Sequence, residues 1–138
     1  MTTLNEQLAS LKVIPVIAIN KVEDAIPLGK ALVDNGMPCA EITFRTECAA
    51  EAIAVMRKEF PEMLIGAGTV LTNAQVDQAI EAGVDFIVSP GFNPRTVQYC
   101  LDKNVPIVPG VNNPSLLNKQ WRWAYVHLSF SLQNLQVA

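Results

Sequence analysis

The sequence predicts an α/β fold that is built from repeated strand–helix units. Short segments rich in β-branched residues alternate with longer segments whose apolar residues recur at helical spacing. Residue types that end helices recur every 21–25 residues, at Gly36, Pro61, Gly83 and Asn104. Such strict alternation with short connections implies a parallel sheet with right-handed crossovers, either an open doubly wound sheet or a closed barrel.

Five segments have the composition of buried parallel strands, because they are short, apolar and bounded by turn residues. These segments are 13–19, 40–44, 64–67, 86–89 and 106–111. Four amphipathic segments between them are predicted to be helices, namely 22–35, 48–60, 73–82 and 94–103. The predicted helix starts carry capping residues, namely Thr46 or Glu47, Thr72 or Asn73, and Asn93 with Pro94. The predicted helix ends carry Gly36, Gly83 and Asn104.

Polar residues gather at the C-terminal end of every predicted strand, from Asn20 in the first to Asn113 after the fifth. A (β/α)8 TIM barrel concentrates its chemistry on this one face, whereas an open sheet binds ligands mainly at one switch point. The barrel is therefore favoured. A complete barrel needs eight strands and roughly 200–250 residues. The 138 residues of this chain predict an incomplete barrel of about five βα units.

Composition and charge exclude several function classes. Half of the residues are apolar, the net charge is −3, and no basic run occurs, so nucleic acid is not an expected partner. The longest apolar run, 13–19, is too short to cross a membrane, and residues 1–12 lack the order of a signal peptide. We therefore expect a cytoplasmic protein. The three cysteines fit no metal-binding spacing and are expected to be buried, and His127 is assigned no role, so no metal is expected.

Candidate catalytic residues lie on the second predicted strand. Strand alternation places Glu41, Thr43 and Arg45 on one face of it. Burying both charges there is costly unless they are paired or used. One interpretation is an ion pair that neutralises itself at the rim of the barrel. The other is a site in which Glu41 transfers protons next to a carbonyl group and Arg45 binds a substrate carboxylate.

Two further strand ends carry weaker indications of a site. Gly66, Gly68 and Thr69 form either a tight turn without a ligand or a place where substrate approaches the backbone and the Thr69 hydroxyl binds it. Pro90 fixes the loop after the fourth strand, and Gly91 permits a positive φ there.

Together these motifs resemble those of the bacterial KHG/KDPG aldolases, and they follow the family order without gaps over residues 1–116. The motifs are VIPVIA at 13–18, AEITFRTEC at 40–48, IGAGTVL at 65–71, VSPG at 88–91 and IVPGVNNP at 107–114. The resemblance implies a (β/α)8 barrel, usually a homotrimer, without metal or cofactor. It implies cleavage of 2-dehydro-3-deoxy-6-phosphogluconate (KDPG) to pyruvate and glyceraldehyde 3-phosphate, and of 4-hydroxy-2-oxoglutarate (KHG) to pyruvate and glyoxylate.

The resemblance also implies a role for individual residues. In the family a lysine forms a Schiff base with the keto group, and the iminium accepts electrons while the carbon–carbon bond breaks. Glu41 matches the general acid/base. Arg45 matches the ligand of the pyruvate carboxylate, Thr69 matches a second pyruvate ligand, and Pro90 lines the pocket. The implied partners are small keto acids, including pyruvate and a phosphorylated sugar acid.

The family lysine is missing from this chain. It belongs to a Leu-Lys-Phe-Phe-Pro-Ala-Glu motif on the sixth strand, and its slot is occupied by Ser129, which cannot form an iminium. Residues 117–138 also differ from the rest, because they contain no acidic residue and a cluster of aromatic ones. We therefore predict a boundary at residue 116, followed by a tail unrelated to the family.

A shift of reading frame explains the tail. Residues 117–138 can be encoded so that the alternate frame reads LKFFPAE, with lysine in the slot of Ser129. The hypothesis is a single-base loss near the codon for Leu116. Lys21 and Lys119 remain as alternative nucleophiles.

Two function classes follow for the chain as written. The first is a class I aldolase by descent that is inactive alone because its nucleophile is gone. The second is a non-catalytic fragment that binds keto acids weakly or associates with intact subunits. An unfinished barrel also leaves sheet edges unpaired, so self-association or aggregation is expected.

Overall fold

Five parallel strands form one sheet, in the order β1-β2-β3-β4-β5, in a computed structural model that describes residues 3–119. The strands are β1 (Val16–Ile17), β2 (Cys39–Thr43), β3 (Leu64–Gly68), β4 (Phe86–Ser89) and β5 (Ile107–Pro109). Every neighbouring pair is parallel, and the order in space equals the order in the chain. This is the arrangement of the first part of a (β/α)8 barrel, so the predicted fold class is confirmed.

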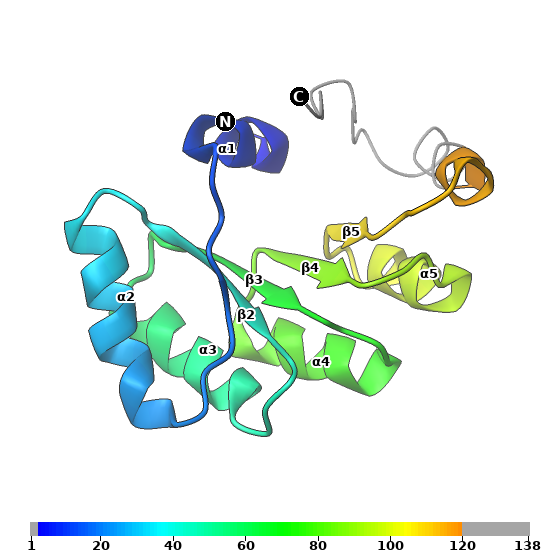
Figure 1. The fold of residues 1–138 in the computed structure, drawn as a ribbon. Helices are drawn as coiled ribbons and strands as arrows, with labels where there is room; N and C mark the ends of the chain where they lie inside the picture. The colour runs from blue at the N-terminus through cyan, green and yellow to red at the C-terminus, as the bar shows by residue number, and fades with distance from the viewer. Residues whose placement is uncertain (1–2, 120–138) are drawn as a thin grey trace.

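Helices cover one face of this sheet (Figure 1). They are the 3-10 helix η1 (Val22–Asp24) and the α-helices α2 (Ala25–Asp34), α3 (Ala49–Glu59), α4 (Asn73–Ala82) and α5 (Pro94–Asp102). Alternate strand residues are buried against them, namely Ala40, Ile42, Ile65, Ala67, Ile87 and Ile107. Because side chains alternate between the faces of a strand, Glu41, Gly66 and Gly68 belong to the opposite, inner face.

Most of the predicted helix ends are confirmed. Thr72 forms a capping box with Gln75 at the start of α4. The Asn93 side chain accepts a hydrogen bond from the Arg95 backbone N–H, with Pro94 in the first turn of α5. Gly83 ends α4 with a left-handed φ of 90°.

The predicted cap of α3 is wrong. Cys48 is the N-cap residue, and no side chain bonds to the helix start. The Thr46 hydroxyl instead donates to the Ile19 carbonyl at 2.6 Å, and the Cys48 thiol donates to the same oxygen at 3.1 Å. Both groups therefore tie the loop after β2 to the segment after β1.

Two of the three cysteines are buried, as expected. Cys39 and Cys100 are fully buried, whereas Cys48 is half-buried, and all three are free thiols. Burial raises the pKa of Cys39, and it raises the pKa of Cys100 to about 11. These two thiols therefore remain protonated at neutral pH.

An N-terminal helix, α1 (Leu4–Leu11), was not predicted. Thr3 and Glu6 form a capping box at its start, a pattern that the sequence displays as Thr-Leu-Asn-Glu. Figure 1 shows α1 on the side of the sheet opposite to α2, α3 and α4. Within residues 3–119, every helix is too short or too polar to cross a membrane.

The last described residues are helical. Residues 114–119 are helical, and the Leu116 backbone N–H donates to the Asn113 side chain at 2.9 Å. The boundary predicted at residue 116 falls inside this stretch. Residues 120–138, with Ser129 and His127, lie outside the described part of the chain.

Candidate active site

The C-terminal ends of the strands are joined along one edge of the sheet. The backbone N–H of Phe44, just after β2, donates to the Gly68 carbonyl at 2.8 Å. Farther along the same edge, the N–H of Gly110 donates to the Ser89 carbonyl at 2.8 Å. The residues that follow β2 and β3 therefore start from adjacent positions, and so do those that follow β4 and β5, as they do on the catalytic face of a barrel.

Glu41 stands on the inner face of the sheet. Its neighbours along the strand, Ala40 and Ile42, are fully buried against the helices, whereas Glu41 is half-buried. Its partners across the sheet are Val16 on β1 and Gly66 on β3. The predicted inward orientation of Glu41 is thus what the structure shows.

The Glu41 carboxylate lies against the backbone of Gly68. A Cβ atom added to Gly68 would overlap Oε1, Cδ and Cγ of Glu41. Burial raises the pKa of this carboxyl group, and the positive charge of Arg45 opposes that rise. A carboxyl group whose pKa is shifted towards neutrality is suited to proton transfer.

Arg45 lies beyond the end of β2, so the predicted strand pleat does not set its direction. β2 ends at Thr43, and Phe44 and Arg45 belong to the following turn. Both residues line the same pocket of about 420 Å³. Arg45 is exposed, and the described residues contain no ion pair between it and Glu41. The self-neutralising pair is therefore not formed.

Thr69 follows Gly68 and adopts a left-handed backbone conformation, with φ of 58°. This conformation is strained for a residue with a side chain, and such strain concentrates at functional sites. Thr69 is half-buried, and within residues 3–119 its hydroxyl has no hydrogen-bond partner. The hydroxyl is therefore available to a ligand.

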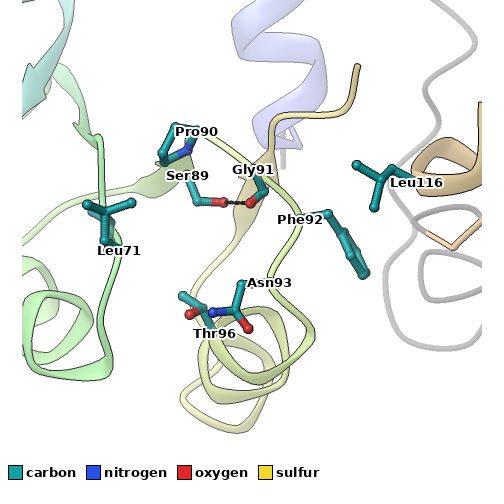
Figure 2. Close-up of a pocket in the computed structure, with 9 residues that line it drawn as sticks. Leu71, Ser89, Pro90, Gly91, Phe92, Asn93, Thr96 and Leu116 are labelled. Carbon is teal, nitrogen blue, oxygen red and sulfur yellow. Dashed lines mark hydrogen bonds between the residues drawn. The ribbon is translucent and has the colours of Figure 1, made fainter. Parts of the chain in front are cut away.

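Pro90 lines a second pocket, of about 330 Å³, which is shown in Figure 2. The Ser89 hydroxyl donates to the Gly91 carbonyl at 2.9 Å and braces the loop. Other lining residues are Val70, Leu71, Phe92, Asn93, Thr96 and Leu116. Glu41, Arg45 and Thr69 do not line it, so the four predicted site residues share one edge of the sheet without sharing one pocket.

The two alternative lysines lie in exposed segments. Lys21 precedes η1, and its ammonium group is 3.9 Å from a Glu23 carboxylate oxygen. Lys119 lies in the helical stretch 114–119.

Two features that hold residues in place at this edge were not predicted from the sequence. One is the bond from Thr46 to Ile19, which holds the turn that carries Arg45. The other is the empty position at Gly68, which the Glu41 carboxylate fills. The glycines of β3 indicate a close approach, but their spacing does not say that a side chain from β2 makes it.

The sequence is similar to those of known aldolases. The family model "KDPG and KHG aldolase" matches residues 4–131. A 2-dehydro-3-deoxy-phosphogluconate aldolase of Treponema pallidum (strain Nichols) is 55% identical over 111 residues, which are 80% of this chain and 53% of that protein. The enzyme of the same name from Haemophilus influenzae is 53% identical over 109 residues, which are 79% of this chain and 51% of that protein. The chain thus spans about half the length of these relatives.

Solved structures of aldolases share this arrangement. A KDPG aldolase from Legionella pneumophila, with pyruvate captured at low pH as a covalent carbinolamine intermediate, matches with a TM-score of 0.84 and 37% identity. The match covers 90% of this chain and 60% of that one. A Zymomonas mobilis ZM4 aldolase with 3-phosphoglycerate matches with a TM-score of 0.76 and 39% identity, over 83% of this chain and 56% of that one.

Proposed function

Because the chain belongs to the KDPG and KHG aldolase family, we propose that its C-terminal strand edge is the pyruvate-binding part of an aldolase active site. The observation that carries this proposal is the half-buried Glu41 carboxyl group, whose pKa is raised by burial on the inner face of the sheet. The exposed Arg45 guanidinium lies at the same edge as the Thr69 hydroxyl, which has no hydrogen-bond partner within residues 3–119. A keto acid presents a carboxylate and a carbonyl, which these groups can bind.

The proposed family reaction is cleavage of KDPG to pyruvate and glyceraldehyde 3-phosphate, or of KHG to pyruvate and glyoxylate. Glu41 moves the protons, Arg45 and Thr69 bind the pyruvate portion, and Pro90 lines the neighbouring pocket at the same edge of the sheet. The electrons of the broken carbon–carbon bond pass to an iminium that an amine of the enzyme forms with the keto group.

On this proposal, the chain as written lacks the lysine that would form the iminium. Ser129 occupies the slot of the family lysine, and a hydroxyl group cannot form an iminium. We therefore propose that this chain alone is inactive, and that a reading-frame shift near the codon for Leu116 replaced the lysine motif. DNA sequencing tests this cause: an alternate frame encoding LKFFPAE supports it, and any other alternate frame rules it out.

The second candidate function is that of a non-catalytic fragment that binds keto acids weakly or associates with intact subunits. What favours it is that Arg45 and Thr69 are retained, while the proposed slot of the lysine holds Ser129. In this case the carboxylate ligands remain while the covalent step is lost.

Borohydride trapping separates the two candidates. The full chain is incubated with pyruvate and sodium borohydride, and the product is analysed by peptide mass spectrometry. A reduced adduct on Lys21 or Lys119 overturns the proposed inactivity and supports an enzyme with a different nucleophile, whereas its absence leaves the fragment. Pyruvate binding is followed in parallel by NMR, with Arg45→Ala expected to abolish it. Lys58→Ala, which removes a charge from the last turn of α3, is the matched control and retains it. A chain that binds no pyruvate contradicts the first candidate and leaves only association with intact subunits from the second.

A further inference from the structure

Strand β3 carries no side chain on the part of its inner face that borders Glu41. Gly66 and Gly68 occupy alternate positions of this strand, and the residue between them, Ala67, is buried against the helices. Side chains from the neighbouring strands fill both gaps. The Phe86 ring from β4 covers Gly66, and the Glu41 carboxylate from β2 covers Gly68.

The register shows how far the Glu41 side chain reaches. The Cα atom of Glu41 is paired with Gly66, yet its carboxylate lies over Gly68. The side chain therefore leans along β3 towards the C-terminal edge, beyond the residue with which its Cα atom is paired. The space directly beside Glu41, above Gly66, is already occupied by the Phe86 ring.

We propose that Gly68 is a positioning residue for Glu41, because its missing side chain lets the carboxylate lie across β3 and reach the edge that carries Arg45 and Thr69. The inference rests on the proposed function for the catalytic role of Glu41. The geometry from which it is drawn does not depend on any substrate.

The backbone at Gly68 makes this proposal testable with one methyl group. Gly36 and Gly83 have left-handed φ angles, but Gly68 does not, so alanine is compatible with its conformation. The three atoms closest to an added Cβ all belong to the Glu41 side chain. Gly68→Ala therefore displaces Glu41 and leaves the backbone in place.

The direct test is a titration of the side-chain carboxyl groups by carbon-13 NMR on the full chain, with Glu41→Gln identifying the Glu41 resonance. Within residues 3–119, Arg45 is the charged group that acts on Glu41, and burial has the larger effect. In Gly68→Ala the carboxylate moves off the strand into solvent, so we expect the pKa of Glu41 to fall. An unchanged pKa overturns the proposal.

A matched control separates this effect from that of adding any methyl group. An added Cβ at Gly91, in an exposed loop, meets nothing within 4 Å. Gly91→Ala is therefore expected to leave the pKa of Glu41 unchanged, and an equal fall in both variants overturns the proposal.

If Gly68→Ala does not fold, the double variant Glu41→Ala, Gly68→Ala shows whether overlap with the Glu41 side chain is the cause. Recovered folding supports the overlap with Glu41, and continued unfolding overturns it.

The outcomes distinguish this inference from the proposed function. If Gly68→Ala lowers the Glu41 pKa but the parent chain binds no pyruvate, the proposed function is wrong and the positioning role of Gly68 stands. If the parent chain binds pyruvate but Gly68→Ala leaves the Glu41 pKa unchanged, the proposed function stands and the positioning role is wrong. When the Glu41 pKa falls and the parent chain binds pyruvate, Gly68→Ala is expected to weaken pyruvate binding.

Discussion

The Arg57 guanidinium binds the Asp85 carboxylate, with Nη2 and Oδ2 2.5 Å apart. The same carboxylate oxygen accepts the backbone N–H of Ile65, and Arg57 also donates to the carbonyls of Gly83 and Met63. One side chain of α3 thus joins the end of α4 to the beginnings of β3 and β4. It holds the edge of the sheet opposite to the candidate active site.

Replacing Arg57 with methionine is expected to destabilise the chain by about 2–4 kcal/mol, because the Asp85 carboxylate loses its charged partner and three carbonyls lose a donor, while the apolar stem is kept. Urea denaturation measures the change. Lys30→Ala breaks only an exposed pair with Asp34, so it serves as control and should leave the denaturation midpoint unmoved. Equal changes in stability for the two variants would show that the hydrogen bonds of Arg57 stabilise the chain no more than an exposed ion pair does.

The pH dependence of stability provides a second prediction. Burial raises the pKa of Glu41 in the folded chain above its value in the unfolded chain. The folded state therefore binds the proton more tightly, and this group makes the chain less stable as the pH rises from the unfolded to the folded pKa. Glu41→Gln should remove this decrease in stability, so the variant should be more stable than the parent at pH values above the folded-state pKa of Glu41. Urea denaturation between pH 4 and pH 8 measures both, and the exposed Glu81→Gln should follow the parent curve.

A third prediction concerns the end of α4. Gly83 has φ of 90°, and an added Cβ would lie 3.0 Å from Cγ of Arg57. Gly83→Ala should therefore cost about 1–2 kcal/mol. Gly91→Ala, which meets no neighbour, should stay within about 0.5 kcal/mol of the parent. Thermal unfolding of both variants checks the difference, and a neutral Gly83→Ala would contradict the strain.

A fourth prediction concerns the edge of the sheet. β1 has one strand neighbour in the described residues, and Val16 on it is 59% exposed. We expect the chain to self-associate through such edges, and Val16→Lys to weaken the association. Sedimentation velocity over a range of concentrations measures this. Val33→Lys, on the exposed surface of α2, is the control and should associate like the parent. A parent chain that stays monomeric throughout would refute the expectation.

Much of this fold could be predicted from local patterns. The helices at 73–82 and 94–103 were predicted almost to the residue, because their capping residues act within a single turn. The Glu41 orientation was predicted for a similar reason, since a buried strand alternates its side chains. The helix at Leu4–Leu11 was missed although its capping box is local, because no strand–helix repeat led to it.

The sequence by itself determined which residues are candidates for the chemistry and which face of β2 holds Glu41, since both depend on residue type and on the period of a strand. Only the tertiary structure decided where β2 ends, and hence that Arg45 leaves the pleat and forms no ion pair with Glu41. It also decided that the Glu41 carboxylate rests on Gly68, which is 27 positions away along the chain. The physical reason is that strand ends and side-chain overlaps are set by neighbouring strands, whose register no local pattern encodes.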